Sequence, residues 1–223
     1  MIAAVLFDLD GTLLNRDASV VSFINEQYER MQPSLGHIPK ALYAERFIEL
    51  DRRGYVWKDK VYAQLIQEFE IKDTTWEFLL EDYLANFQFH CVPFGGLRTL
   101  LEDLKGQGLK LGIISNGKGK FQMDNIKALG IEIYFDTILI SESEGLRKPD
   151  PRIFERAMAR LNVLPSVSLF IGDHPTTDVE AAENAGMLGI WKKDAGWSKA
   201  AADYSIDELN EVKRIVQRLN AQK

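Results

Sequence analysis

Two aspartates close to the N-terminus have the type and spacing of a catalytic carboxylate pair. Asp8 and Asp10 follow the apolar run 3–7, and in extended backbone residues two apart project to the same side. Gly11 then allows a sharp turn, and Thr12 follows it. A carboxylate such as that of Asp8 can attack a phosphoryl group and carry it as an acyl phosphate, which divides one difficult hydrolysis into two steps.

Further polar residues follow three later apolar runs, which span residues 109–115, 135–140 and 167–171. They are Ser115 and Asn116 at the end of the first run, Lys148 in the loop after the second, and Asp173 and Asp178 after the third. Because the carboxyl ends of parallel strands lie along one edge of a sheet, these groups can converge there. The four aspartates would then repel one another strongly unless a cation were present.

A cluster of this composition predicts a magnesium site. Carboxylate oxygens, waters and phosphate oxygens are the ligands that Mg²⁺ takes in proteins. A lysine and a serine nearby would add a cation and a hydrogen-bond donor for an anionic oxygen. Positioning and charge neutralisation carry most of the catalysis in phosphoryl transfer, so we expect Mg²⁺-dependent chemistry on a phosphate ester.

The elements that must position these groups alternate along most of the chain. Short apolar runs bounded by turn residues predict buried parallel strands at 3–7, 109–115, 135–140, 167–171 and, more weakly, 187–191. Helical patterns lie between them at 96–105, 120–129, 151–161 and 177–185, and a last helix is expected over 206–219. This alternation predicts an α/β fold with a doubly wound parallel sheet.

One region interrupts the alternation. Between Asn15 and Cys91 the sequence shows only amphipathic helical stretches, at 20–31, 41–53, 58–69 and 75–89. We therefore predict a core formed by residues 1–14 and 92–223, with an inserted α-helical cap domain over residues 15–91. Ligands of open α/β sheets bind outside the carboxyl ends of the strands, and an insertion directly after the first strand can cover that place.

Basic residues around 54–57 are the least decisive feature of the insertion. They are Arg52, Arg53, Lys58 and Lys60. They could meet the leaving group of a substrate, but we interpret most of them as solvated helix charges.

The composition excludes several classes of protein. Hydrophobic residues make up 46% and charged residues 27% of the chain, which is typical of a globular protein. A net charge of −6 without a basic run disfavours binding to a nucleic acid polymer. The single cysteine, Cys91, favours a reducing compartment, and we find neither a signal peptide nor an apolar run near the ~20 residues of a membrane span. We therefore expect a cytoplasmic monomer or dimer without a membrane partner.

The polar groups, taken in order, resemble the four motifs of the haloacid dehalogenase-like (HAD) superfamily. The matching segments are Asp8 to Thr12, Ser115, Lys148, and residues 172–178. The resemblance covers roughly residues 1–14 and 92–223, and the helical insertion resembles the C1-type cap of subfamily I. It implies a Rossmannoid core and phosphatase activity.

The resemblance also implies a role for each acidic position. Asp8 would be the nucleophile and a Mg²⁺ ligand. Asp10 would protonate the leaving alcohol, then activate water, and would bind the metal through its backbone carbonyl. Asp173 would ligate the metal, while Asp178 would orient the metal or a water bound to it.

Other positions would hold the phosphate. Ser115 would donate a hydrogen bond to it, and Lys148 would hold both the phosphate and the nucleophile. The predicted residues are Asp8, Asp10, Ser115 and Lys148 for catalysis, Thr12, Ser115, Asn116 and Lys148 for the substrate phosphate, and Asp8, Asp10, Asp173 and Asp178 for the metal.

Three alternatives to a phosphatase remain at this point. A phosphomutase acting on a sugar phosphate would use the same core residues. Dehalogenases of the superfamily lack the second aspartate, because halide leaves without a proton, so Asp10 favours phosphate-ester hydrolysis. A non-catalytic binding protein is the third alternative, although no residue of the catalytic set is missing. The sequence around 172–191 is similar to phosphatases of nucleotides or sugar phosphates, and we expect a small phosphorylated metabolite of that kind as the partner.

Overall fold

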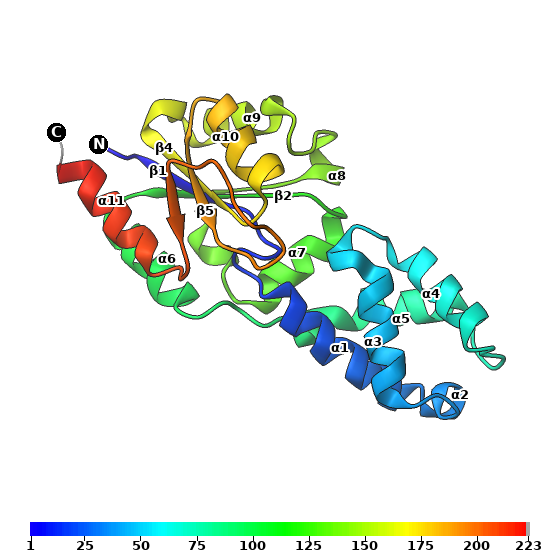
Figure 1. Cartoon of the computed structure of the whole chain (residues 1–223). Coiled ribbons are helices and arrows are strands. Elements are labelled where there is room, and N and C mark those ends of the chain that lie inside the picture. The colour runs from blue at the N-terminus through cyan, green and yellow to red at the C-terminus, as the bar shows by residue number, and fades with distance from the viewer. Residues whose placement is uncertain (222–223) are drawn as a thin grey trace. The chain divides into compact units, whose positions relative to one another are not determined.

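The computed structural model describes residues 1–221. The chain forms two compact units, one of Met1–Asn15 with Pro93–Lys223 and the other of Arg16–Val92 (Figure 1). We call them the sheet unit and the helical unit.

A six-stranded sheet forms the centre of the sheet unit, in the order β3-β2-β1-β4-β5-β6. Its strands are β1 (Ala4–Phe7), β2 (Lys110–Ser115), β3 (Thr137–Ile140), β4 (Ser168–Gly172), β5 (Leu188–Lys192) and β6 (Tyr204–Ile206). All neighbouring strands are parallel, and the last residue of β1, Phe7, pairs with Ile113 on one side and Ile171 on the other. The carboxyl ends therefore share one edge, and the order of the strands reverses beside β1, where α/β sheets bind ligands.

Helices cover both faces of this sheet (Figure 1). They are α6 (Leu97–Gly106), α7 (Gly119–Ala128), α8 (Ser141–Glu144), α9 (Pro151–Leu161), the π-helix η5 (Pro175–Glu180), α10 (Ala181–Asn184) and α11 (Glu211–Ala221), with short 3-10 turns η3 (Glu132–Tyr134) and η4 (Pro165–Val167). On the face of α9 and α10, Leu6, Ile114 and Phe170 of the strands belong to one buried apolar cluster with the two helices. The helices α6 and α11 contact each other and lie on the opposite side of the sheet in Figure 1. The predicted α/β fold with a doubly wound parallel sheet is confirmed.

Two predicted elements at the C-terminal end are wrong in detail. The helix expected over 206–219 begins only at Glu211, because Ile206 ends the short strand β6. Within the described residues this strand pairs with β5 alone and lies at the sheet edge, so it lacks the continuous apolar run of a central strand. The helix expected over 177–185 is the π-helix η5 followed by α10.

The helical unit contains no strand within residues 16–92, as predicted. Its elements are α1 (Arg16–Arg30), α2 (Gln32–Leu35), α3 (Lys40–Asp51), the 3-10 turn η1 (Arg52–Gly54), α4 (Lys58–Glu68), α5 (Trp76–Asn86) and the 3-10 turn η2 (Phe87–His90). Aromatic side chains fill its core, where the rings of Phe23 and Tyr83 meet edge to face at 5.1 Å. That this unit caps a site remains a prediction.

Arg52, Arg53 and Lys60 are exposed, which agrees with the interpretation of most of these basic residues as solvated charges, but Lys58 is an exception. Its side chain is buried and forms an ion pair with the buried carboxylate of Asp51. The apolar stem of a lysine at the start of an amphipathic helix can pack inward when an acidic partner lies there.

Within the described residues 1–221, no helix is long and apolar enough for a membrane span.

Candidate active site

The end of β1 turns abruptly and leaves Asp8 at the edge of the sheet. The amide of Asp8 donates to the carbonyl of Ile171 at 2.8 Å, so the residue continues the ladder between β1 and β4. Gly11 has a positive φ of 83°, and a Cβ at this position would lie 2.5 Å from Oδ2 of Asp173. A glycine is therefore required both for the turn and for the approach of Asp173.

Lys148 connects two of the predicted acidic residues. Its Nζ donates to Oδ1 of Asp8 at 2.6 Å and to Oδ1 of Asp178 at 2.7 Å, and all three side chains are buried. Carboxylate oxygens of Asp8, Asp173 and Asp178 lie within 4.8 Å of one another. We call these four residues the carboxylate cluster. Three carboxylates and one ammonium carry a net charge of −2 when all are ionised.

Burial and mutual repulsion disfavour that ionised state. Burial raises the pKa of Asp8 to about 7, with Lys148 lowering it and the charge of Asp178 raising it further. Burial likewise raises the pKa of Asp173 to about 8, and the charges of Asp8 and Asp178 act in the same direction. For Lys148 burial lowers the pKa, but the attraction of Asp178 and Asp8 outweighs burial, so the pKa is raised and the amine stays protonated.

The composition of this cluster fits a divalent cation. Its donors are carboxylate oxygens, which hard cations such as Mg²⁺ prefer, and its surplus charge of −2 equals the charge that such an ion neutralises. The carboxylate of Asp10 is not among these three. The sequence analysis assigned metal binding to the backbone carbonyl of Asp10, and that assignment remains a prediction.

The loop that carries Lys148 is fixed by Asn116. The side-chain Nδ2 of Asn116 donates to the carbonyl of Lys148, and its Oδ1 accepts from the amide of Lys148, both at 2.9 Å. The end of β2 thereby positions the lysine that enters the cluster. The side chain of Asn116 thus binds the backbone of Lys148, and its predicted contact with the substrate phosphate remains a prediction.

Asp178 reaches the cluster from the π-helix η5. Its Oδ2 accepts from the amide of His174 at 3.0 Å. A Cβ on Gly172 would lie 2.3 Å from the Cβ of Asp178, so the glycine allows this close approach. The first turn of η5 is capped by His174, whose Nδ1 accepts from the amides of Thr176 and Thr177 at 3.1 and 3.2 Å. An isolated Asp178 could have been a helix cap, but His174 takes that position.

A second group of hydrogen bonds surrounds Asp10. Oδ2 of Asp10 accepts from Nε2 of Gln122 at 2.6 Å, and the same nitrogen donates to Oγ of Ser115 at 2.8 Å. Gln122 lies on α7 and is buried. The sequence analysis missed it, because one glutamine in an amphipathic helix carries no signal of its own. The available signal was a second amide, Asn125, three residues later on the same buried face.

The hydroxyl of Thr12 has a different environment. Thr12 is fully buried, and its Oγ1 has no hydrogen-bond partner among the residues that the structure describes. Buried hydroxyls almost always find a partner, so this one is available to a ligand or a water. The assignment of Thr12 to the substrate phosphate remains a prediction.

A comparison with known protein families identifies the family of this chain. The model of the haloacid dehalogenase-like hydrolases matches residues 5–192. The chain belongs to this family. It is thus a hydrolase, and the resemblance stated from the four motifs is confirmed.

Individual relatives of the hydrolase carry different names. It is 31% identical over 204 residues to a protein of Methanothermobacter thermautotrophicus named "Glyceraldehyde 3-phosphate phosphatase", with 85% of each chain covered. A solved HAD phosphatase from Thermococcus onnurineus has a TM-score of 0.68 and 30% identity, over 96% of this chain and 98% of that one. A solved 2-haloacid dehalogenase from Pseudomonas syringae also reaches a TM-score of 0.68, with 26% identity over 98% of this chain and all (100%) of that one.

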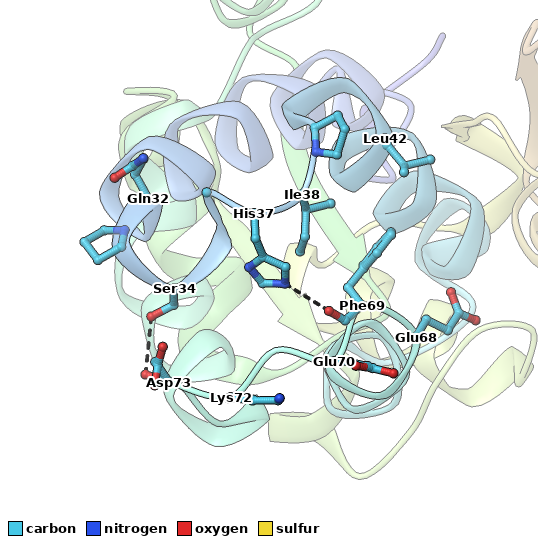
Figure 2. A pocket seen from close by; sticks show the side chains of 13 residues that line it. Gln32, Ser34, His37, Ile38, Leu42, Glu68, Phe69, Glu70, Lys72 and Asp73 are labelled. Atoms are coloured by element: carbon cyan, nitrogen blue, oxygen red, sulfur yellow. Dashed lines mark hydrogen bonds between the residues drawn. The ribbon is translucent and has the colours of Figure 1, made fainter.

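The helical unit of the hydrolase contains a hollow of about 800 Å³ (Figure 2). His37 lies in it, and its Nε2 is 3.0 Å from the carbonyl oxygen of Phe69. Oγ of Ser34 donates to the carbonyl of Asp73 at 3.3 Å on one side of the hollow. None of the predicted site residues lines this hollow. Asp8, Ser115 and Asp173 stand instead at the carboxyl ends of β1, β2 and β4.

Proposed function

We propose that this hydrolase is a Mg²⁺-dependent phosphatase that cleaves a small phosphomonoester through an aspartyl phosphate on Asp8. The observation that carries the proposal is the carboxylate cluster, in which three carboxylates lie close together and one ammonium binds two of them. Such a site gains from a divalent cation, and with the cation in place it can accept an anionic ester.

The residues of the chain divide the reaction into two steps. Asp8, Asp173, Asp178 and the backbone carbonyl of Asp10 would hold Mg²⁺, which would neutralise charge on the phosphoryl oxygens. In the first step a carboxylate oxygen of Asp8 attacks phosphorus, the bond to the leaving oxygen breaks, and Asp10 gives that oxygen a proton. In the second step Asp10 takes a proton from water, the water oxygen attacks phosphorus, and the bond to Asp8 breaks. Lys148 and Ser115 hold the phosphoryl oxygens throughout.

The position of Asp10 supports its role as the acid and base. Its carboxylate is outside the carboxylate cluster and is not bound by Lys148, whose Nζ donates to Asp8 and Asp178. A carboxyl group outside the metal cluster is free to carry a proton to the leaving group. An alkoxide leaves poorly without such a proton, whereas a halide needs none.

The substrate we propose is a small alkyl phosphate. The relative from Methanothermobacter thermautotrophicus is named for glyceraldehyde 3-phosphate, so a three-carbon sugar phosphate is the first candidate. Other sugar phosphates and nucleotides belong to the same chemical class. The single cysteine and the metabolite substrate agree with a cytoplasmic enzyme.

Dehalogenation is the second candidate, because the solved dehalogenase has as high a TM-score as the solved phosphatase. Asp10 and its contact with Gln122 favour the phosphatase. A phosphomutase would use the same residues and differ only in where the phosphoryl group goes.

A substrate panel tests the proposal. We expect free phosphate from glyceraldehyde 3-phosphate and other sugar phosphates with Mg²⁺, and none after chelation. Release of halide from a 2-haloacid without Mg²⁺ would establish a dehalogenase. An isomerised sugar phosphate without free phosphate, detected by mass spectrometry, would establish a mutase.

Replacing the proposed acid tests its role directly. Asp10→Asn should lower kcat/KM for alkyl phosphates by about 100-fold or more, the usual contribution of a general acid. The loss should be much smaller for p-nitrophenyl phosphate, because that phenolate leaves without protonation. Equal losses on both substrates would contradict the role of Asp10.

A further inference from the structure

The amide of Gln122 forms hydrogen bonds through both its nitrogen and its oxygen at the edge of the site. Its nitrogen donates to Oδ2 of Asp10 at 2.6 Å and to Oγ of Ser115 at 2.8 Å. Its oxygen accepts from Nδ2 of Asn125 at 3.2 Å. Two donors and one acceptor are thus engaged, and the side chain is buried.

The surroundings fix which end of the amide faces Asp10. The carbonyl oxygen of Asn116, 3.5 Å from Nε2 of Gln122, can only accept hydrogen bonds. The same holds for the carboxylate of Asp10 while it is ionised. A flipped amide would bring its oxygen against both of them and would lose the donation from Asn125. The nitrogen of Gln122 therefore faces Asp10.

Gly117 leaves space for the side chain of Gln122 to reach this place. A Cβ on Gly117 would lie 2.7 Å from Cγ and 3.0 Å from Cδ of Gln122. The turn after β2 thus fits a glutamine at this position of α7.

We propose that Gln122 is the positioning residue of the general acid, holding Oδ2 of Asp10 so that Oδ1 carries the transferable proton. An oxygen that accepts a hydrogen bond from an amide cannot point its own proton along the same line, so the proton belongs on the other oxygen. During leaving-group departure the proton passes from Oδ1 of Asp10 to the ester oxygen as the P–O bond breaks. This inference rests on the proposed function, since it requires Asp10 to be an acid.

The same amide orients Ser115. Because Oγ of Ser115 accepts from Gln122, its own hydrogen is free to donate elsewhere, for example to a phosphoryl oxygen. Loss of this second effect would weaken every phosphate ester equally. The first effect should depend on the leaving group, and this dependence separates the two.

The test compares kcat/KM for an alkyl phosphate with kcat/KM for p-nitrophenyl phosphate. Both constants report the steps up to loss of the leaving group. Gln122→Met keeps the size of the side chain and removes both donations. Because hydrogen bonds to charged groups contribute about 1.5 to 3 kcal/mol, we expect the alkyl-to-aryl ratio to fall by about 10- to 100-fold.

Gln27 of the helical unit provides a matched control. This buried glutamine also donates to a carboxylate, Oδ2 of Asp82 at 2.9 Å, and accepts from the hydroxyl of Tyr62 at 2.8 Å. Gln27→Met should lower the melting temperature but leave the alkyl-to-aryl ratio unchanged.

A double variant shows whether Gln122 acts through Asp10. In the Asp10→Asn background, Gln122→Met should not lower the ratio further, because the acid is already absent. An unchanged ratio in Gln122→Met, beside a lowered ratio in Asp10→Asn, would overturn the inference and leave the proposed function intact. An unchanged ratio in Asp10→Asn itself would overturn the acid role and the inference with it. Should Gln122→Met not fold, Gly117→Ala displaces the same side chain and must give the same selective loss.

Discussion

Two buried lysines, Lys148 in the sheet unit and Lys58 in the helical unit, differ in the charges that surround them. In the sheet unit Lys148 lies between Asp8 and Asp178, and Asp173 adds a third carboxylate. In the helical unit Lys58 forms an ion pair with the carboxylate of Asp51. The other oxygen of Asp51 binds a second cation, Arg16, at 2.6 Å.

The charges of the carboxylate cluster fit a ligand, whereas the charges around Lys58 stabilise the fold. Oδ2 of Asp51 also accepts from the amide of Gly54 at 2.9 Å, and so closes the turn η1. In this turn Arg52 and Arg53 have positive φ angles of 46° and 57°, which residues other than glycine rarely adopt. The group of Asp51, Lys58 and Arg16 thus stabilises a strained turn with the charges of its own residues. The carboxylate cluster has a negative surplus, which bound protons or an external cation can balance.

The largest difference between the two clusters should be seen in turnover. Asp8→Asn removes the proposed nucleophile and should lower kcat/KM by more than about 1000-fold, while its nearly equal shape preserves the fold. Asp51→Asn should change kcat/KM far less at a temperature where the variant is folded. Phosphate release, with circular dichroism as a check of folding, measures both. Full activity of purified Asp8→Asn would remove Asp8 as the nucleophile.

The next difference should be seen in stability without metal. Asp51→Asn leaves the buried ammonium of Lys58 without its carboxylate, and breaking a buried ion pair in this way costs about 3 to 5 kcal/mol. Asp173→Asn removes one of three mutually repelling carboxylates and should leave the metal-free protein at least as stable. Urea unfolding of both variants with chelator gives the comparison. A more stable Asp51→Asn would show that its charges carry no structural role.

The order of strands and helices in the sheet unit was easier to predict from the sequence than the contacts between its side chains. The strands before Asp8, Ser115 and Asp173 are short apolar runs closed by polar residues, and a parallel sheet places their ends together whatever the details of packing. The position of Gln122 depends on how α7 packs on the sheet, which no spacing in the chain encodes. Strand β6 was missed because it is a short strand at the edge of the sheet, paired with β5.

Buried charge was harder to predict than buried apolar surface. In the sequence, Lys58 and Lys148 both have acidic residues nearby. Only its place in the motif after β3 distinguished Lys148 from Lys58. Charged side chains are almost never fully buried without a partner, and the partner of Lys58 became evident only from the contact between α3 and α4.

The smallest effect we expect is a pH dependence confined to the carboxylate cluster. The pKa of Asp8 is raised to about 7 and that of Asp173 to about 8, from an ordinary value of 3.8. Both carboxyls therefore bind protons more tightly in the folded protein than in the unfolded chain. Their contribution to stability is fully present below about pH 4 and is lost as the pH rises through about 7 to 8.

Magnesium should reverse this loss, because the ion takes the place of the protons. At a concentration of about 100 times its Kd it would add about 2.7 kcal/mol to the free energy of unfolding. The increase in melting temperature caused by Mg²⁺ should be larger at about pH 8 than at about pH 5, where protons compete for the same oxygens. Asp51→Asn should keep this pH-dependent increase and Asp173→Asn should lose most of it, because only the second residue belongs to the cluster with surplus negative charge. An increase of equal size at both pH values would mean that the ion binds elsewhere.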